Sequence, residues 1–148
     1  MSRIIINEVN ILTVWMTIVC AVSSLEITSL SIPSYREKGQ NISFHCDYNV
    51  DRSKVAELDI KWYIGSSPSP FMVFLPHLQK EPQVVEPRFR EKIVFSDGVV
   101  GSGFMMVNVT TDMSGVYTCK VSTNTEERIR RKRVTVYSKY GLYLQGFC

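Results

Sequence analysis

The sequence predicts an all-β fold for most of its 148 residues. Apolar and polar residues alternate with a period of two over short runs, and clusters of turn residues separate these runs. No stretch shows the period of an amphipathic helix. The chain has the length of one ordinary globular domain, without an internal repeat or a low-complexity segment. One all-β domain is therefore expected.

The clearest strands are the runs at 41–48 and 58–64. Alternation puts one apolar set of each run on a single inward face, namely Ile42, Phe44, Cys46 and Tyr48 in the first run and Leu58, Ile60, Trp62 and Ile64 in the second. Further strands are expected at 71–75, 88–95, 104–109, 116–122 and 129–137. The segments 65–70 and 97–103 are typical of turns, and 76–87, with three prolines, is the longest expected loop.

Residues 1–24 have the layout of a secretory signal peptide. Arg3 gives a positive start, residues 11–22 form an apolar run, and Val22-Ser23-Ser24 suits cleavage before Leu25. Glu8 is unusual in such a leader. An uncleaved membrane anchor would need about 20 apolar residues, which this run does not reach. We expect an exported chain with no membrane span in its mature form.

Cysteines in an exported chain are expected to form disulfides, because the compartment is oxidising. Cys20 leaves with the signal peptide, and no C-x-x-C spacing suggests zinc. Cys46 and Cys119 each lie in the middle of an alternating run, whereas Cys148 is the last residue. The first two are predicted to pair, which leaves Cys148 surplus.

A wider pattern surrounds these cysteines. Trp62 follows Cys46 by sixteen residues, and Tyr117 lies two residues before Cys119 in the run Asp112-Met-Ser-Gly-Val-Tyr-Thr-Cys. Over residues 25–137 this resembles a variable-type immunoglobulin domain. The resemblance implies a two-sheet Greek-key sandwich in which the disulfide bridges the sheets, the Trp62 indole packs against it, and the Tyr117 hydroxyl bonds back across a turn. More narrowly, Asp59–Tyr63 and Phe71–Pro76 are similar to arthropod surface immunoglobulin proteins of the beaten-path type.

The chain also departs from that pattern. Met113 stands where the family usually has an acidic residue, with Asp112 one place earlier, which leaves open the family's ion pair to Arg88. Residues 50–57 lengthen the loop before Trp62. The last strand lacks a Gly-x-Gly bulge, which argues against an antibody-style dimer.

Nothing in the sequence indicates catalysis, a metal or a cofactor. His45 is the outward neighbour of Cys46, and His77 lies in the proline-rich loop, so neither has the setting of a general base. Gly101-Ser-Gly103 is followed by no helix and no Lys-Ser/Thr, as a phosphate loop would require. The net charge of +3 is too small to indicate nucleic-acid binding. We expect a binding protein rather than an enzyme.

The most charged stretch is a basic run of five cations, Arg128, Arg130, Arg131, Lys132 and Arg133. It has three interpretations. It is a solvated hairpin leading into the last strand, with Val134 and Val136 inward; a contact for sulfated glycans, since clustered guanidinium groups bind sulfate oxygens; or a proprotein cleavage site. Cleavage there would sever the last strand.

Two glycosylation sequons are present, Asn41-Ile-Ser43 and Asn108-Val-Thr110. Both asparagines are predicted to point outward from strands that share one sheet in an immunoglobulin sandwich. Glycans would shield that sheet and leave the opposite one free for a partner. The exposed set expected there is Lys61, Tyr63, Phe74 and Lys120.

The favoured function is therefore a secreted or cell-surface recognition module that contacts a surface protein, another immunoglobulin-domain protein above all, in adhesion or guidance. The alternative is a soluble immune or sulfated-glycan-binding effector that uses the basic hairpin. For residues 138–148, three explanations stay open: a disordered end, a truncated isoform, or an intermolecular disulfide through Cys148.

Overall fold

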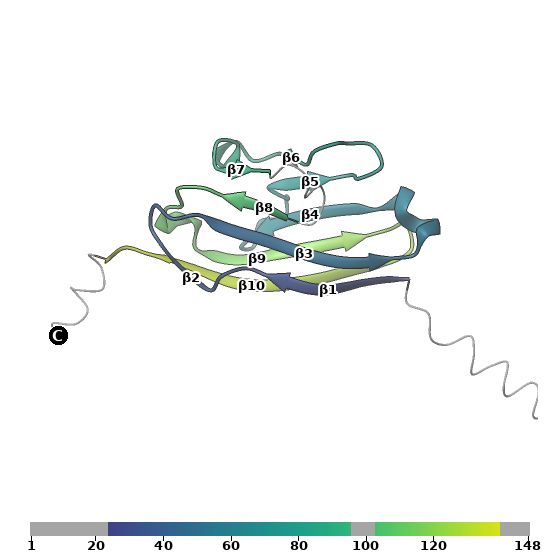
Figure 1. The fold of residues 1–148 in the computed structure, drawn as a ribbon, viewed down its shortest axis with the longest axis horizontal. Coiled ribbons are helices and arrows are strands. Elements are labelled where there is room, and N and C mark those ends of the chain that lie inside the picture. The colour runs from purple at the N-terminus through teal and green to yellow at the C-terminus, as the bar shows by residue number, and fades with distance from the viewer. Residues whose placement is uncertain (1–23, 96–102, 140–148) are drawn as a thin grey trace, which may run out of the picture.

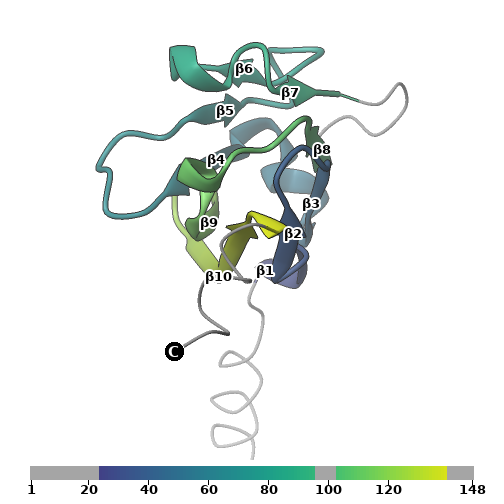
Figure 2. The same cartoon turned by 90° about the vertical axis from the view of Figure 1, so that its left-hand side faces the viewer.

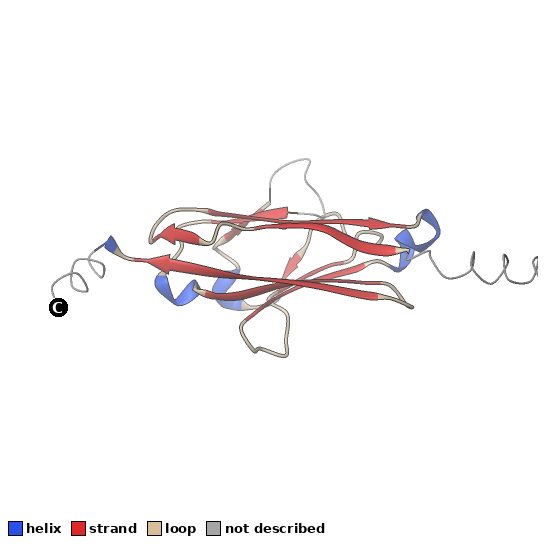
Figure 3. Ribbon diagram, turned by 90° about the horizontal axis from the view of Figure 1, so that it is seen from below, coloured by secondary structure: helices blue, strands red, loops and turns tan. Residues whose placement is uncertain are grey.

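A computed structural model of the chain describes residues 24–95 and 103–139. The predicted leader up to residue 23, most of the turn at 97–103 and the end of the chain with Cys148 lie outside the described residues. Within the described part, ten strands form two sheets that face each other, with only short 3-10 turns between them (Figures 1 and 3).

The four-stranded sheet contains, in spatial order, β1 (Leu25–Ser31), β3 (Ile42–Val50), β8 (Gly103–Met106) and β7 (Ile93–Val94). The six-stranded sheet contains β2 (Tyr35–Glu37), β10 (Glu127–Tyr137), β9 (Gly115–Ser122), β4 (Asp59–Ile64), β5 (Met72–Phe74) and β6 (Gln83–Val84). Neighbouring strands are antiparallel except β2 and β10, which are parallel. The 3-10 turns are η1 (Arg52–Glu57), η2 (Pro87–Phe89) and η3 (Thr111–Met113). Figure 2 shows β1 and β10 at the same side of the molecule, where the two sheets come close.

The predicted inward faces of the first two strand runs are confirmed. Seven of these eight residues are buried, and Tyr48 is partly buried against the same core. The disulfide joins Cys46 of β3 to Cys119 of β9 with a Cα–Cα distance of 6.6 Å, so it bridges the two sheets. Trp62 lies directly opposite Cys119 in the pairing of β4 with β9, which makes the indole a same-face neighbour of the disulfide.

Phe44 lies in the middle of an aromatic cluster that fills the space between the sheets. Its ring centroid is 4.6 Å from that of Phe104, 4.9 Å from that of Tyr117 and 5.8 Å from that of Trp62. Phe71, directly before β5, adds an edge contact to Tyr117. Because each ring touches rings from other strands, the cluster ties both sheets into one core.

Tyr117 makes the hydrogen bond that the resemblance to immunoglobulin domains implies. Its hydroxyl donates to the Met113 carbonyl at 2.6 Å, across the turn that leads into β9. Burial raises the pKa of the Tyr117 hydroxyl far above its ordinary value. The group therefore stays protonated, and stays a donor, throughout the physiological pH range.

Tyr117→Phe is expected to lower the free energy of unfolding by about 1 to 2 kcal/mol, because the Met113 carbonyl loses its buried donor while the ring packing is kept. Urea unfolding followed by tryptophan fluorescence measures the loss. Tyr35→Phe is the matched control, since the Tyr35 side chain is 68% exposed and should be neutral. Equal stability of the two variants would contradict this role for the hydroxyl.

Two of the predicted strands are shorter than expected. The run 88–95 is mostly not a strand: Pro87 begins η2, the buried Phe89 ring anchors it, and only Ile93–Val94 pair with β8. The run 104–109 ends as a strand at Met106, because Asn108 adopts a left-handed φ of 47° that no strand accommodates. Conversely, the expected loop 76–87 contains the short strand β6.

The ion pair that the family makes between this turn and Arg88 is not found among the described residues. Arg88 instead pairs with Glu86, and its guanidinium lies 4.5 Å from the centroid of the Phe89 ring. Asp112 accepts a hydrogen bond from the Thr110 side chain, which lowers the pKa of this exposed carboxyl. The turn before β9 is also tied to β10, because the Val136 N–H donates to the Ser114 hydroxyl at 2.9 Å.

Candidate functional site

The outward residues of β4, β9 and β10 come together on the solvent side of the six-stranded sheet. Strand pairing places Lys61 opposite Lys120, and Lys120 opposite Ile129. It also places Tyr63 opposite Thr118, and Thr118 opposite Arg131. We call this surface the outer face and define it by these side chains: Lys61, Tyr63, Thr118, Lys120, Ile129 and Arg131.

One residue predicted for this surface is not on it. Phe74 is 3% exposed and lies in the core, so the expectation that it is free for a partner is wrong. The reason is register: Phe74 pairs with Ile60, which points inward, and Lys61 pairs with Val73. Because side chains alternate along a strand, the outward position of β5 is Val73.

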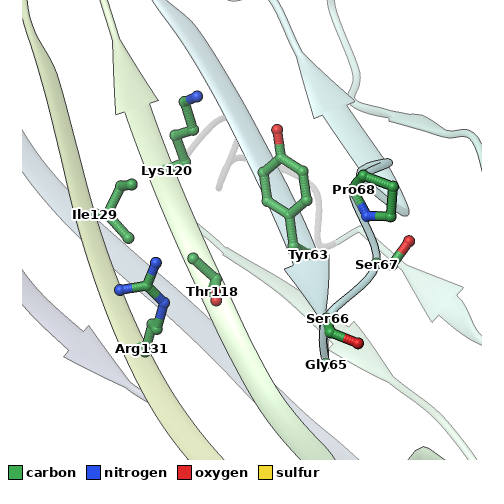
Figure 4. Close-up of a pocket in the computed structure, with 9 residues that line it drawn as sticks. All are labelled: Tyr63, Gly65, Ser66, Ser67, Pro68, Thr118, Lys120, Ile129 and Arg131. Carbon is green, nitrogen blue, oxygen red and sulfur yellow. The ribbon is translucent and has the colours of Figure 1, made fainter.

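A shallow hollow of about 340 Å³ lies at the centre of the outer face. The turn at 65–68, including Pro68, closes one side, and the side chains of Tyr63, Lys120, Ile129 and Arg131 surround the rest (Figure 4). Gly65 enters that turn with a φ of 62°, which glycine adopts without strain. The hollow therefore offers an aromatic ring and an aliphatic side chain between cationic groups.

The two lysines of this face are held in ion pairs. The Lys61 ammonium lies 2.5 Å from a carboxylate oxygen of Asp59, and that of Lys120 lies 2.7 Å from Glu127. The bond to Glu127 raises the pKa of Lys120, so its ammonium stays charged. Arg131 has no ion pair within the part of the chain that the structure describes. It is the cation that this face leaves for a partner.

Sequence reasoning missed Ile129 and Arg131 as members of this surface. Both belong to stretches that were identified, the last strand and the basic run, but neither was connected with Tyr63. Their juxtaposition depends on the register of β10 against β9, which spans Glu127–Val134. Alternation alone indicates which residues share a side of β10, and only the pairing shows what lies beside them.

The basic run belongs to the hairpin of β9 and β10, as part of its second strand and not as its turn. The turn lies earlier, where the Thr123 N–H donates to the Glu126 carbonyl at 2.9 Å. Residues 128–133 are part of β10 itself. Arg128 pairs with Glu126 at 3.3 Å, whereas no ion pair of the described residues involves the remaining four cations, Arg130, Arg131, Lys132 and Arg133. As expected, Val134 and Val136 are buried.

The two sequons lie next to each other. Asn41 immediately precedes β3 and Asn108 follows β8, and the backbone N–H of Asn108 donates to the side-chain oxygen of Asn41 at 3.1 Å. Both side chains are exposed. The predicted position of Asn108 within a strand is wrong, since it occupies a turn. Glycans at these positions would thus start from one end of the four-stranded sheet rather than from along its face.

Within the part of the chain that the structure describes, the side chains of His45 and His77 take part in no hydrogen bond or ion pair. No group of three or more His, Cys, Asp or Glu residues within 24–95 and 103–139 is arranged to hold a metal ion. No helix in those same ranges is long and apolar enough to cross a membrane.

Comparison with known proteins supports the fold directly. The structure matches the human B7-H4 IgV-like domain with a TM-score of 0.55 at 17% identity, over 78% of this chain and 98% of that one. The fold is a variable-type immunoglobulin sandwich. It also matches a chimeric titin Z1Z2 carrying an exogenous decorin peptide, with a TM-score of 0.50 at 15% identity, over 80% of this chain and 99% of that one.

No family model matches the sequence, and no curated protein matches it either. At such low identities the two structures bear on the fold alone. The narrower resemblance to beaten-path proteins stays a prediction.

Proposed function

We propose that this chain is an exported recognition module that binds a cell-surface protein through its outer face. The observation that carries the proposal is the hollow in which Tyr63 and Ile129 lie between the cations Lys120 and Arg131. Aromatic and arginine side chains dominate the binding energy of protein interfaces. Because the hollow is built on paired strands, little conformational entropy would be lost when a partner docks.

The finer assignment rests on the sequence. The leader at 1–24 supports export, and a disulfide between the sheets fits an oxidising compartment. We propose adhesion or guidance as the setting and another immunoglobulin-domain protein as the partner. A screen of the tagged protein against a panel of surface immunoglobulin proteins tests this directly. Saturable binding that survives heparinase supports the proposal, and binding lost after heparinase points to the glycan alternative.

Tyr63→Ala is expected to weaken partner binding at least tenfold, about 1.4 kcal/mol, because it removes the ring from the centre of the face. Lys120→Glu is expected to do the same by placing a carboxylate beside Glu127 and reversing the charge at the hollow. Surface plasmon resonance against the partner measures both. Tyr35→Ala is the matched control, since Tyr35 is exposed but does not line the hollow. An unchanged affinity of Tyr63→Ala would exclude the outer face.

The glycan control needs variants that preserve the local hydrogen bonds. Asn41→Gln would displace the oxygen that accepts the Asn108 N–H, so Ser43→Ala, on the exposed side of β3, is the better way to remove the first sequon. Asn108→Asp removes the second and tolerates the left-handed backbone. We expect the combined variant to keep its affinity. Loss of binding here, with Tyr63→Ala unaffected, would assign the contact to the four-stranded sheet.

A further inference from the structure

Strand β10 has an open edge over its first half. Strand β9 pairs with β10 from Glu127 to Val134, but β2 pairs with the opposite edge only from Thr135 to Tyr137. The nearby strand β1 belongs to the other sheet and pairs with β3 (Figure 2). Before Thr135, therefore, no strand of the described residues occupies the second edge of β10.

The backbone groups on this edge can be identified from one hydrogen bond. The Thr135 N–H donates to the Ser34 carbonyl at 2.8 Å, so Thr135 directs its backbone groups away from β9. Along a strand, N–H and C=O groups point alternately to the two sides. Ile129, Arg131 and Arg133 have the same parity as Thr135, so their backbone donors and acceptors form a row on the open edge.

The side chains around this row are strongly cationic. Arg130, Arg131 and Arg133 are exposed, and they and Lys132 have no ion pair within the described residues. Charged side chains on an edge strand oppose pairing with another edge of like charge. A second copy of β10 is disfavoured for that reason. The segment that this edge favours is an extended one with carboxylates.

We propose that the open edge of β10 takes up an extended acidic segment of a partner protein as an added strand. The backbone row of Ile129, Arg131 and Arg133 supplies the hydrogen bonds, and the arginines pair with carboxylates on alternate residues of the segment. A sulfated glycan would meet the same cations but would leave the backbone row unpaired, so the register favours the peptide. This edge shares Ile129 and Arg131 with the outer face, whereas Tyr63 belongs to the outer face alone, so Tyr63→Ala distinguishes binding at the two surfaces.

The first test compares two synthetic peptides on the purified full chain. One alternates glutamate with threonine and is as long as the open stretch. The other has the same sequence and charge but is N-methylated on alternate residues, which removes the backbone donors along one edge of the peptide. Fluorescence anisotropy is expected to show saturable binding of the first and a loss of about tenfold or more for the second. Equal affinities would show that only charge acts and would overturn strand addition.

The second test changes the protein. Ile129→Pro removes a donor that faces the open edge and leaves the bonds to β9 in place, a substitution that edge strands tolerate. It is expected to weaken peptide binding about tenfold, whereas Tyr63→Ala leaves it intact. Unchanged binding by Ile129→Pro, or binding of a heparin oligosaccharide without any binding of the peptide, would overturn the proposal. If Ile129→Pro fails to fold, the two peptides still decide the matter on the unaltered chain.

Discussion

Replacing Cys46 and Cys119 together by alanine is expected to lower the free energy of unfolding by about 4 kcal/mol. The disulfide spans a sequence separation of 73 residues, and its loss frees a long loop in the unfolded chain. Cys46 and Cys119 are each at most 1% exposed, so replacing their sulfurs by alanine leaves empty space between the sheets. A domain of this size has only about 5 to 15 kcal/mol to lose.

Urea unfolding of the double variant measures this effect, with Trp62 as the fluorescent reporter because it is buried between the sheets. Cys148→Ser is the matched control and should unfold at the same urea concentration as the parent. The prediction fails if the double variant also unfolds with the parent, since the disulfide would then add nothing to the stability of the sandwich.

Phe44→Ala is expected to cost about 3 to 5 kcal/mol, the usual range for removing a fully buried phenylalanine. Phe44 is 0% exposed and contacts aromatic rings from three other strands. Its removal opens a cavity that those rings cannot fill without leaving their rotamers. The effect should therefore exceed that of a truncation at the margin of the core.

Two further substitutions calibrate the Phe44 result. Phe44→Leu keeps much of the volume and should lose clearly less stability than alanine. Val94→Ala tests a side chain that is 44% exposed and should change stability little. Similar losses for Phe44→Ala and Val94→Ala in thermal unfolding would mean that the aromatic cluster does not organise this core.

The core was predictable from the sequence because burial on a strand follows alternation. The burial of Ile42, Phe44 and Cys46 could be predicted without knowing which strands lie beside them. The role of Tyr117 could be predicted from its position two residues before Cys119 in the sequence. Alternation failed where a strand was short. Strand β5 has only three residues and Phe74 is its last, so the side on which Phe74 lies could not be assigned without the pairing to Ile60.

The site was less predictable than the core, because it depends on which strands are neighbours. Tyr63 and Lys120 were predicted to be exposed and are half-buried, because the hollow and the ion pair of Lys120 arise from contacts across β4, β9 and β10. Likewise, no local signal brings Asn41 within hydrogen-bonding distance of Asn108, 67 positions away. The basic run was visible as composition, but its position on an open edge follows from where β2 begins.

The central claim is that the outer face of the six-stranded sheet meets the partner, and hydroxyl-radical footprinting of the complex tests it most directly. The account predicts that Tyr63 and Ile129 become protected from oxidation when the partner binds, while Tyr35, Leu78 and Val94, which are exposed elsewhere, keep their reactivity. Protection of Val94 on the four-stranded sheet, with Tyr63 as reactive in the complex as in the free protein, would contradict it.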